Sequence, residues 1–67
     1  MRRILDIIGD NVKRYREIKA ITQEELSLLC GLHRNYISSV EKGRRNLTLS
    51  SLERISYGLN VNIKDLL

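Results

Sequence analysis

The stretch from Thr22 to Gly43 constrains the fold most, because it carries the start and stop signals of two short helices in close succession. Thr22 and Glu25 have the spacing of a capping box, in which each side chain accepts a hydrogen bond from the other residue's backbone N–H. Gly31 suits the left-handed conformation that ends a helix and turns the chain sharply. The sequence therefore predicts a helix that begins at Thr22, followed by a turn over residues 31–33.

The second short helix is predicted over residues 33–42 and depends on the first for its stability. Ile37 and Val40 form its inner face. His33 stands at its start and lacks the capping tendency of Ser, Thr, Asp or Asn. We therefore expect packing against the apolar residues of the preceding helix, Leu26 and Cys30, to hold this helix in place.

Two longer helices are predicted on either side of this pair. One spans about residues 5–19, because apolar residues recur there at the three-and-four spacing of one helix face: Leu5, Ile8, Val12 and Tyr15. The other begins after Thr48, which can act as its N-cap, and ends at Asn60. Its apolar side is predicted to consist of Leu49, Leu52, Ile55 and Leu59.

A fifth, short helix is predicted near the end of the sequence, because Asn62 and Asp65 have the spacing of a capping pair. No alternation of apolar and polar residues indicates a strand. The expected fold class is all-α, a compact five-helix arrangement in one domain over residues 1–67. A domain of this size buries only about 60% of its unfolded surface, so its stability is expected to be marginal.

Composition excludes several functional classes. The chain has one cysteine, one histidine and no proline, which leaves no disulfide framework and no metal site of the zinc type. Without clustered carboxylates or a glycine-rich phosphate loop, we expect no enzyme and no cofactor. Cys30 is expected to be a small buried apolar residue in a reducing compartment. No run is long enough to span a membrane, so the expected location is the cytoplasm.

Positive charge gathers around the two-helix unit. Twelve Lys and Arg against eight Asp and Glu give a net charge of +4, which favours a polyanionic partner.

The side of the second helix opposite Ile37 and Val40 is polar. In the major groove of DNA an Arg can grip guanine, an Asn can grip adenine, and Ser accepts either. The predicted base-reading residues are Arg34, Asn35, Ser38 and Ser39.

Phosphate contacts are expected on both sides of this helix. Gln23 lies at the start of the first helix of the pair, where its side chain and free backbone amides can meet one phosphate together. The basic loop that follows the second helix can grip another phosphate, and the Tyr36 hydroxyl can donate to one. The full set of predicted phosphate-binding residues is Gln23, Tyr36, Arg45, Asn46, Arg44 and Arg16.

Residues 22–43 closely resemble the Cro and phage-repressor type of helix-turn-helix family, in the string TQ-x-EL, then GL, then YIS-x-VE-x-G. Arg34 before Tyr36, together with residues 45–48, is most similar to the controller proteins of restriction-modification systems. The resemblance implies a lambda-repressor-like five-helix fold and a homodimer on a two-fold symmetric DNA operator. It also implies a structural ion pair between Arg16 and Glu41.

The chain departs from this family at two places. Leu47 stands where the family often has proline, which predicts a less rigid loop. Leu28 and Leu29 stand where polar residues are common, and they can cover either the N-terminal extension or a partner surface.

A dimer interface is predicted near the end of the chain, where apolar residues exceed the obvious needs of the core: Tyr57, Ile63, Leu66 and Leu67. The alternative is that these residues complete the core, which applies above all to Ile63 and Leu66.

The expected function is a transcription regulator whose dimer blocks RNA polymerase or recruits it, most like the autoregulating controller of a restriction-modification system. The alternative is a phage-type repressor, or an antitoxin that binds both DNA and another protein. A protein-binding role would use an apolar surface such as Leu28, Leu29 and Ile18.

Overall fold

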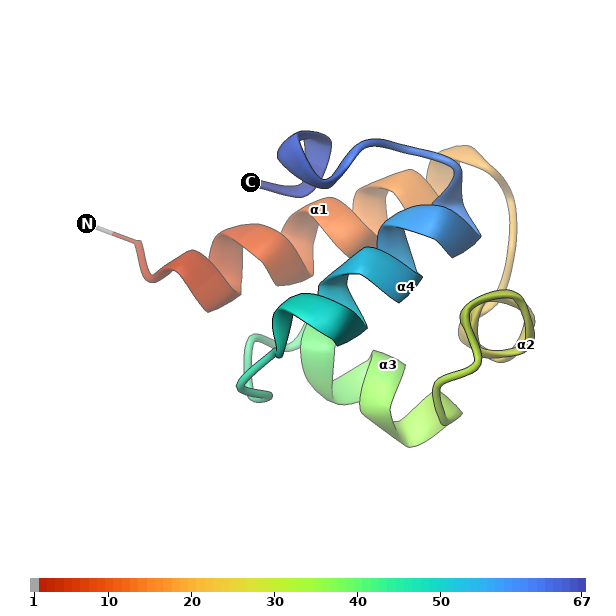
Figure 1. The fold of residues 1–67 in the computed structure, drawn as a ribbon, viewed down its shortest axis with the longest axis horizontal. Coiled ribbons are helices and arrows are strands. Elements are labelled where there is room, and N and C mark those ends of the chain that lie inside the picture. Colours follow the sequence, from red (N-terminus) through yellow and green to blue (C-terminus); the bar gives the residue numbers. More distant parts are fainter. Residues whose placement is uncertain (1) are drawn as a thin grey trace.

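The computed structural model describes residues 2–67, and Met1, the first residue of the predicted domain, lies outside them. Figure 1 shows the architecture, in which every helix contacts at least two others. The elements in chain order are α1 (Ile4–Ile18), α2 (Gln23–Cys30), α3 (Arg34–Glu41), α4 (Leu49–Leu59) and η1 (Ile63–Leu66). No strand occurs in this part of the chain, which confirms the all-α prediction.

The predicted fifth helix is a single 3-10 turn, η1, and this corrects the five-helix count. The capping box of Asn62 and Asp65 is present, with the Asn62 N–H donating to Asp65 Oδ2 at 3.0 Å. Four residues are too few for consecutive α-helical hydrogen bonds, whereas the tighter 3-10 turn closes each bond within three residues. The turn lies back on α1, where Asn11 Nδ2 donates to the Leu66 carbonyl at 2.9 Å.

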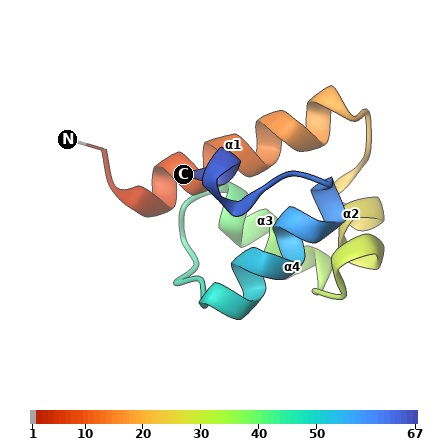
Figure 2. The same cartoon turned by 45° about the horizontal axis from the view of Figure 1, so that its top comes forward.

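One apolar core joins all five elements. Figures 1 and 2 show α1 lying across α3 and α4, with α2 at the far end of the molecule and η1 beside α1. The buried apolar side chains are Ile8, Val12, Leu26, Cys30, Ile37, Val40, Leu52, Ile55, Leu59 and Leu66. Leu66 is therefore a core residue, which is the second of the two roles considered for it. Within residues 2–67, no helix has the length and apolar character needed to cross a bilayer.

Two local predictions require correction. Leu49 is 82% exposed and does not share the buried side of α4 with Leu52, Ile55 and Leu59. Periodicity predicts which side of a helix faces the core, but it does not predict how far along the helix the core extends. Leu49 is the first residue of α4 and lies beyond the part of the helix that the core covers. His33 is also a better cap than expected, because its Nδ1 accepts a hydrogen bond from the Asn35 N–H at 3.0 Å.

Gly9 allows α1 to approach the end of α3 more closely than any other residue would. A Cβ at this position would lie 2.4 Å from the Val40 carbonyl oxygen and 3.0 Å from the Glu41 carbonyl oxygen. Both atoms belong to backbone, which cannot rotate away as a side-chain end can. Sequence reasoning did not identify this constraint, because a glycine inside a helical pattern gives no indication of what approaches it.

Gly9→Ala should lower the free energy of unfolding by about 1–3 kcal/mol, the usual cost of overpacking. The sign is diagnostic, because the same change at an unconstrained helix position stabilises by about 0.5–1 kcal/mol. Urea denaturation followed by circular dichroism measures the difference, and Lys13→Ala, at an exposed position one turn further along α1, serves as the control. A Gly9→Ala variant at least as stable as the wild type would contradict the close-approach argument.

Candidate nucleic-acid interface

The pair α2 and α3 forms as the sequence predicts. The Glu25 N–H donates to Thr22 Oγ1 at 3.0 Å, and the Thr22 N–H donates to Glu25 Oε1 at 2.8 Å, which completes the capping box. Gly31 ends α2 in the left-handed conformation with φ of 72°. The inner residues of α3, Ile37 and Val40, are fully buried. The outer face of α3 therefore has a fixed orientation relative to α2.

The predicted base-reading side chains lie on the outer side of α3. Arg34 and Asn35 are exposed and belong to its first turn, whereas Ser38 and Ser39 are half-buried. At about 100° per residue, Asn35 and Ser39 lie opposite the buried Ile37 and Val40. Arg34 lies on the flank of α3 that faces α2. The structure thus brings these four side chains together on one helix and separates them from the core.

Glu41 joins three elements through one buried carboxylate. Arg16 of α1 donates to it twice, from Nε to Oε2 at 2.7 Å and from Nη2 to Oε1 at 3.1 Å. Gln23 Nε2 of α2 donates to the same Oε1 at 3.1 Å. The third nitrogen of Arg16, Nη1, donates to the Ile21 carbonyl oxygen at 2.9 Å. This network fixes the ends of α2 and α3 against α1.

The surroundings of Arg16 favour its charged form. The side chains of Arg16 and Glu41 are only 13% and 4% exposed. The hydrogen bonds that Arg16 donates to Glu41 raise the pKa of Arg16 above its ordinary value, although burial acts in the opposite direction. Arg16 therefore carries its charge throughout the physiological pH range. Each of its nitrogens donates within the protein, so Arg16 serves here as a structural brace. Two of its five N–H donors remain, and its phosphate contact stays a prediction.

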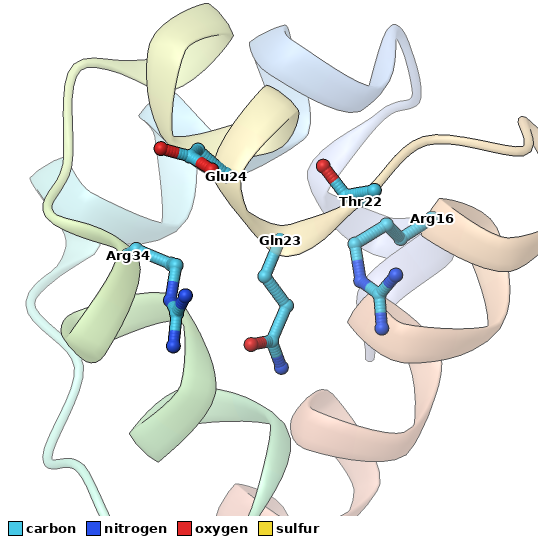
Figure 3. Close-up of a pocket in the computed structure, with 5 residues that line it drawn as sticks. All are labelled: Arg16, Thr22, Gln23, Glu24 and Arg34. Carbon is cyan, nitrogen blue, oxygen red and sulfur yellow. The ribbon is translucent and has the colours of Figure 1, made fainter.

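A shallow hollow lies beside this network, between the starts of α2 and α3. It is lined by Arg16, Thr22, Gln23, Glu24 and Arg34. Figure 3 shows Gln23 between Arg34 and Arg16, with the polar ends of these three side chains projecting toward the same side. Within residues 2–67, the N–H groups of Gln23 and Glu24 have no hydrogen-bond partner, as is usual in a first helical turn. The hollow therefore presents cationic and N–H donors together.

The other flank of α3 is formed by Tyr36 and the loop that follows the helix. The Arg45 guanidinium carbon lies 4.6 Å from the centroid of the Tyr36 ring. Arg44 and Asn46, the other predicted phosphate contacts in this loop, are exposed. Positive and hydrogen-bonding groups thus lie on both flanks of the outer face of α3.

Sequence reasoning missed how this loop begins. Gly43 has a φ of 70°, and its carbonyl oxygen accepts from Arg3 Nη2 at 3.1 Å. Arg3 also forms an ion pair with Asp6, and their hydrogen bonds lower the pKa of the Asp6 carboxyl below its ordinary range. A Cβ on Gly43 would collide with Asp6 Oδ1. The glycine signals the end of α3, which the structure confirms, but it gives no indication of the contacts with Arg3 and Asp6.

Cys30 takes no part in these contacts. It is buried in the core against α4, and burial raises the pKa of its thiol. A protonated, enclosed thiol is the form that behaves as a small apolar residue.

Removing one partner of the Arg16–Glu41 pair should be far more costly than removing both. Arg16→Met and Glu41→Leu should each lower the free energy of unfolding by about 3–5 kcal/mol, because each leaves a buried charge uncompensated. The double variant should lose much less than the sum. Urea denaturation of all four proteins measures the coupling. Additive losses would show that the two side chains do not act as a pair.

Comparisons with known proteins agree with this geometry. The helix-turn-helix family model matches residues 12–66. The control protein C.SmaI of Serratia marcescens is 45% identical over 64 residues, which cover 96% of this chain and 76% of that protein. The control protein C.BamHI of Bacillus amyloliquefaciens is 45% identical over 62 residues, covering 91% and 76%.

Among solved structures, the restriction-modification controller protein C.AhdI from Aeromonas hydrophila superposes with a TM-score of 0.91 at 32% identity, covering 94% of this chain and 96% of that one. Sequence and fold therefore lead to the same group of DNA-binding regulators, which are not enzymes. The chain belongs to the helix-turn-helix family of transcription regulators and is similar, within it, to the control proteins of restriction-modification systems.

Proposed function

We propose that this chain is the autoregulating controller of a restriction-modification system, and that it binds a two-fold symmetric DNA operator as a homodimer in the cytoplasm. The observation that carries the proposal is the rigid presentation of Arg34 and Asn35 in the first turn of α3. A helix-turn-helix directs this end of its second helix toward the base edges. The similarity to control proteins supports the same function.

Base reading is assigned to the outer side of α3. The Arg34 guanidinium can donate two hydrogen bonds to guanine, and the Asn35 amide can both donate to adenine and accept from it. Ser38 and Ser39 are half-buried and suit short contacts near the helix surface. Each good base contact contributes about 1–3 kcal/mol of discrimination, so one domain alone specifies too short a site.

Phosphate binding is assigned to the two flanks. Gln23 and the partner-free N–H groups at the start of α2 form one anchor, beside the hollow lined by Arg34. Arg44, Arg45 and Asn46 form the second, next to the Tyr36 ring. Contacts of this kind set the register of the helix in the groove and make the affinity depend on salt.

A second copy of the chain would supply the missing specificity. Tyr57 is 83% exposed and Leu67 is 56% exposed, while Ile63 is half-buried. These three residues remain available for a symmetric contact, whereas Leu66 belongs to the core. A two-fold dimer on B-DNA would place its two α3 helices about 34 Å apart, in successive major grooves. Because dimer formation depends on protein concentration, expression of the regulated genes would be delayed and self-limiting. The operator-bound dimer would exclude RNA polymerase from the promoter or contact it.

A second candidate function is that of a phage-type repressor or an antitoxin that also holds another protein. The exposure of Leu28 (80%), Leu29 (56%) and Ile18 (69%) supports it, because these side chains lie outside the core. A salt series distinguishes the two functions. Binding through phosphates weakens steeply as salt rises, whereas an apolar protein contact depends on it little.

Arg34→Ala should weaken operator binding by about 1–3 kcal/mol and relax specificity at one base pair of each half-site. Arg14→Ala is the matched control, because it removes the same charge from the side of α1 that faces away from α3. Gel-shift titration against operator and scrambled DNA measures both effects. If the two variants lost the same affinity for operator DNA, Arg34 would contribute only its positive charge and would not read a base.

Tyr57→Glu should raise the dimer dissociation constant by about tenfold or more, because it introduces a charge into an aromatic contact. Leu28→Glu is the control, since Leu28 is about as exposed but lies on α2. Sedimentation equilibrium measures self-association, and circular dichroism verifies the fold. A dimer that tolerates Tyr57→Glu as well as Leu28→Glu would place the contact between copies elsewhere.

A further inference from the structure

The contact between Tyr36 and Arg45 joins the reading helix to a loop residue. The Arg45 guanidinium lies over the Tyr36 ring at 4.6 Å from its centroid, within the range of a cation–π interaction. Within residues 2–67, no hydrogen bond or ion pair involves the Arg45 side chain. The aromatic ring is therefore the feature that orients this guanidinium.

Tyr36 occupies a particular position on α3. At about 100° per residue, Tyr36 and Arg34 lie about 160° apart around the helix axis, on opposite flanks of the outer face. Arg34 borders the hollow at the start of α2, as Figure 3 shows. Tyr36 is half-buried and packs against the core, so its ring is held from behind. The Arg45 guanidinium lies over one face of this ring.

The loop itself is held at its ends and open in the middle. The Gly43 N–H donates to the Val40 carbonyl and the Arg44 N–H donates to the Ser39 carbonyl, both at 3.0 Å. At the other end Leu47 packs against the core and Thr48 caps α4. Between these anchors, no backbone hydrogen bond from the described part of the chain, residues 2–67, fixes Arg45. Without the ring, its side chain would sample many rotamers in solvent.

We propose that Tyr36 is a positioning residue, whose ring holds the Arg45 guanidinium beside α3 so that its edge can bind a DNA phosphate. The proposal rests on the DNA-binding function proposed above and deepens it. Stacking covers the flat face of the guanidinium and leaves its N–H donors free at the edge. The conformational entropy of the Arg45 side chain is then already reduced in the free protein, so less entropy is lost when the protein binds DNA. This increases the affinity for DNA. The working group of Tyr36 is thus its ring, and the hydroxyl is not required.

The stack is testable in the free protein, without any DNA. Ring currents should shift the Arg45 δ-methylene protons upfield in the NMR spectrum of the wild type and of Tyr36→Phe. Tyr36→Leu should remove that shift, and the spectrum of residues in α1 reports whether the variant still folds. Random-coil shifts for the Arg45 side chain in the folded wild type would overturn the proposal.

A double-mutant cycle tests the consequence for DNA binding. Tyr36→Leu should weaken operator binding about two- to fivefold, the effect of one exposed cation–π contact, while Tyr36→Phe should stay within about twofold of the wild type. In an Arg45→Ala background, Tyr36→Leu should have little further effect. Arg45→Ala should also reduce the salt slope of binding by about one, on operator and scrambled DNA alike.

Two results would overturn the inference while leaving the proposed function intact. One is an effect of Tyr36→Phe as large as that of Tyr36→Leu, because it would assign the role to the hydroxyl. The other is independence of the two substitutions in the cycle. Failure of the proposed function has a different signature, because the wild-type protein itself would then bind operator and scrambled DNA equally.

Discussion

The ion pair between Arg16 and Glu41 is the interaction on which the geometry of the candidate interface depends. It joins the last turn of α1 to the last residue of α3, and Gln23 adds the start of α2 to the same carboxylate. Burying two charges costs desolvation free energy, so such a pair need not increase net stability. The ion pair instead fixes the orientation of α3 relative to α1. Apolar packing alone tolerates small rotations of a helix, whereas a bidentate ion pair does not.

Close backbone contact complements this polar brace. Gly9 allows α1 to meet the carbonyl groups at the end of α3, and Gly58 similarly brings α4 against Cys30 of α2. The apolar core then fills the space between these crossings. With only 67 residues, the domain has few alternative contacts to compensate for a lost one. The two glycines and the ion pair therefore matter more here than comparable features would in a larger protein.

The candidate interface is built from three segments that are separate in the sequence. The start of α2 supplies Gln23 and free N–H groups, α3 supplies the reading face, and the following loop supplies Arg45 against Tyr36. Each segment is fixed by a different kind of interaction, namely a capping box, apolar packing and an aromatic stack. In the proposed function, this division separates the groups that read bases from those that hold the phosphates on either flank.

The sequence by itself determined the features that depend on neighbours a few residues away. The caps at Thr22 and Asn62, the turn at Gly31 and the inner faces of the helices follow from local spacing and backbone preference. The Arg16–Glu41 pair was anticipated through a family resemblance, since no local rule links residues 25 positions apart.

Only the tertiary structure decided the features that depend on which surfaces meet. Periodicity placed Leu49 in the core and left Leu66 between core and interface, but an apolar side chain does not specify what covers it. The stack of Arg45 on Tyr36 and the contact of Gly9 with Val40 likewise arise from the path of the folded chain. All of these features have the same physical reason. Burial and proximity are properties of the packed structure, and the spacing of residues within one segment does not encode them.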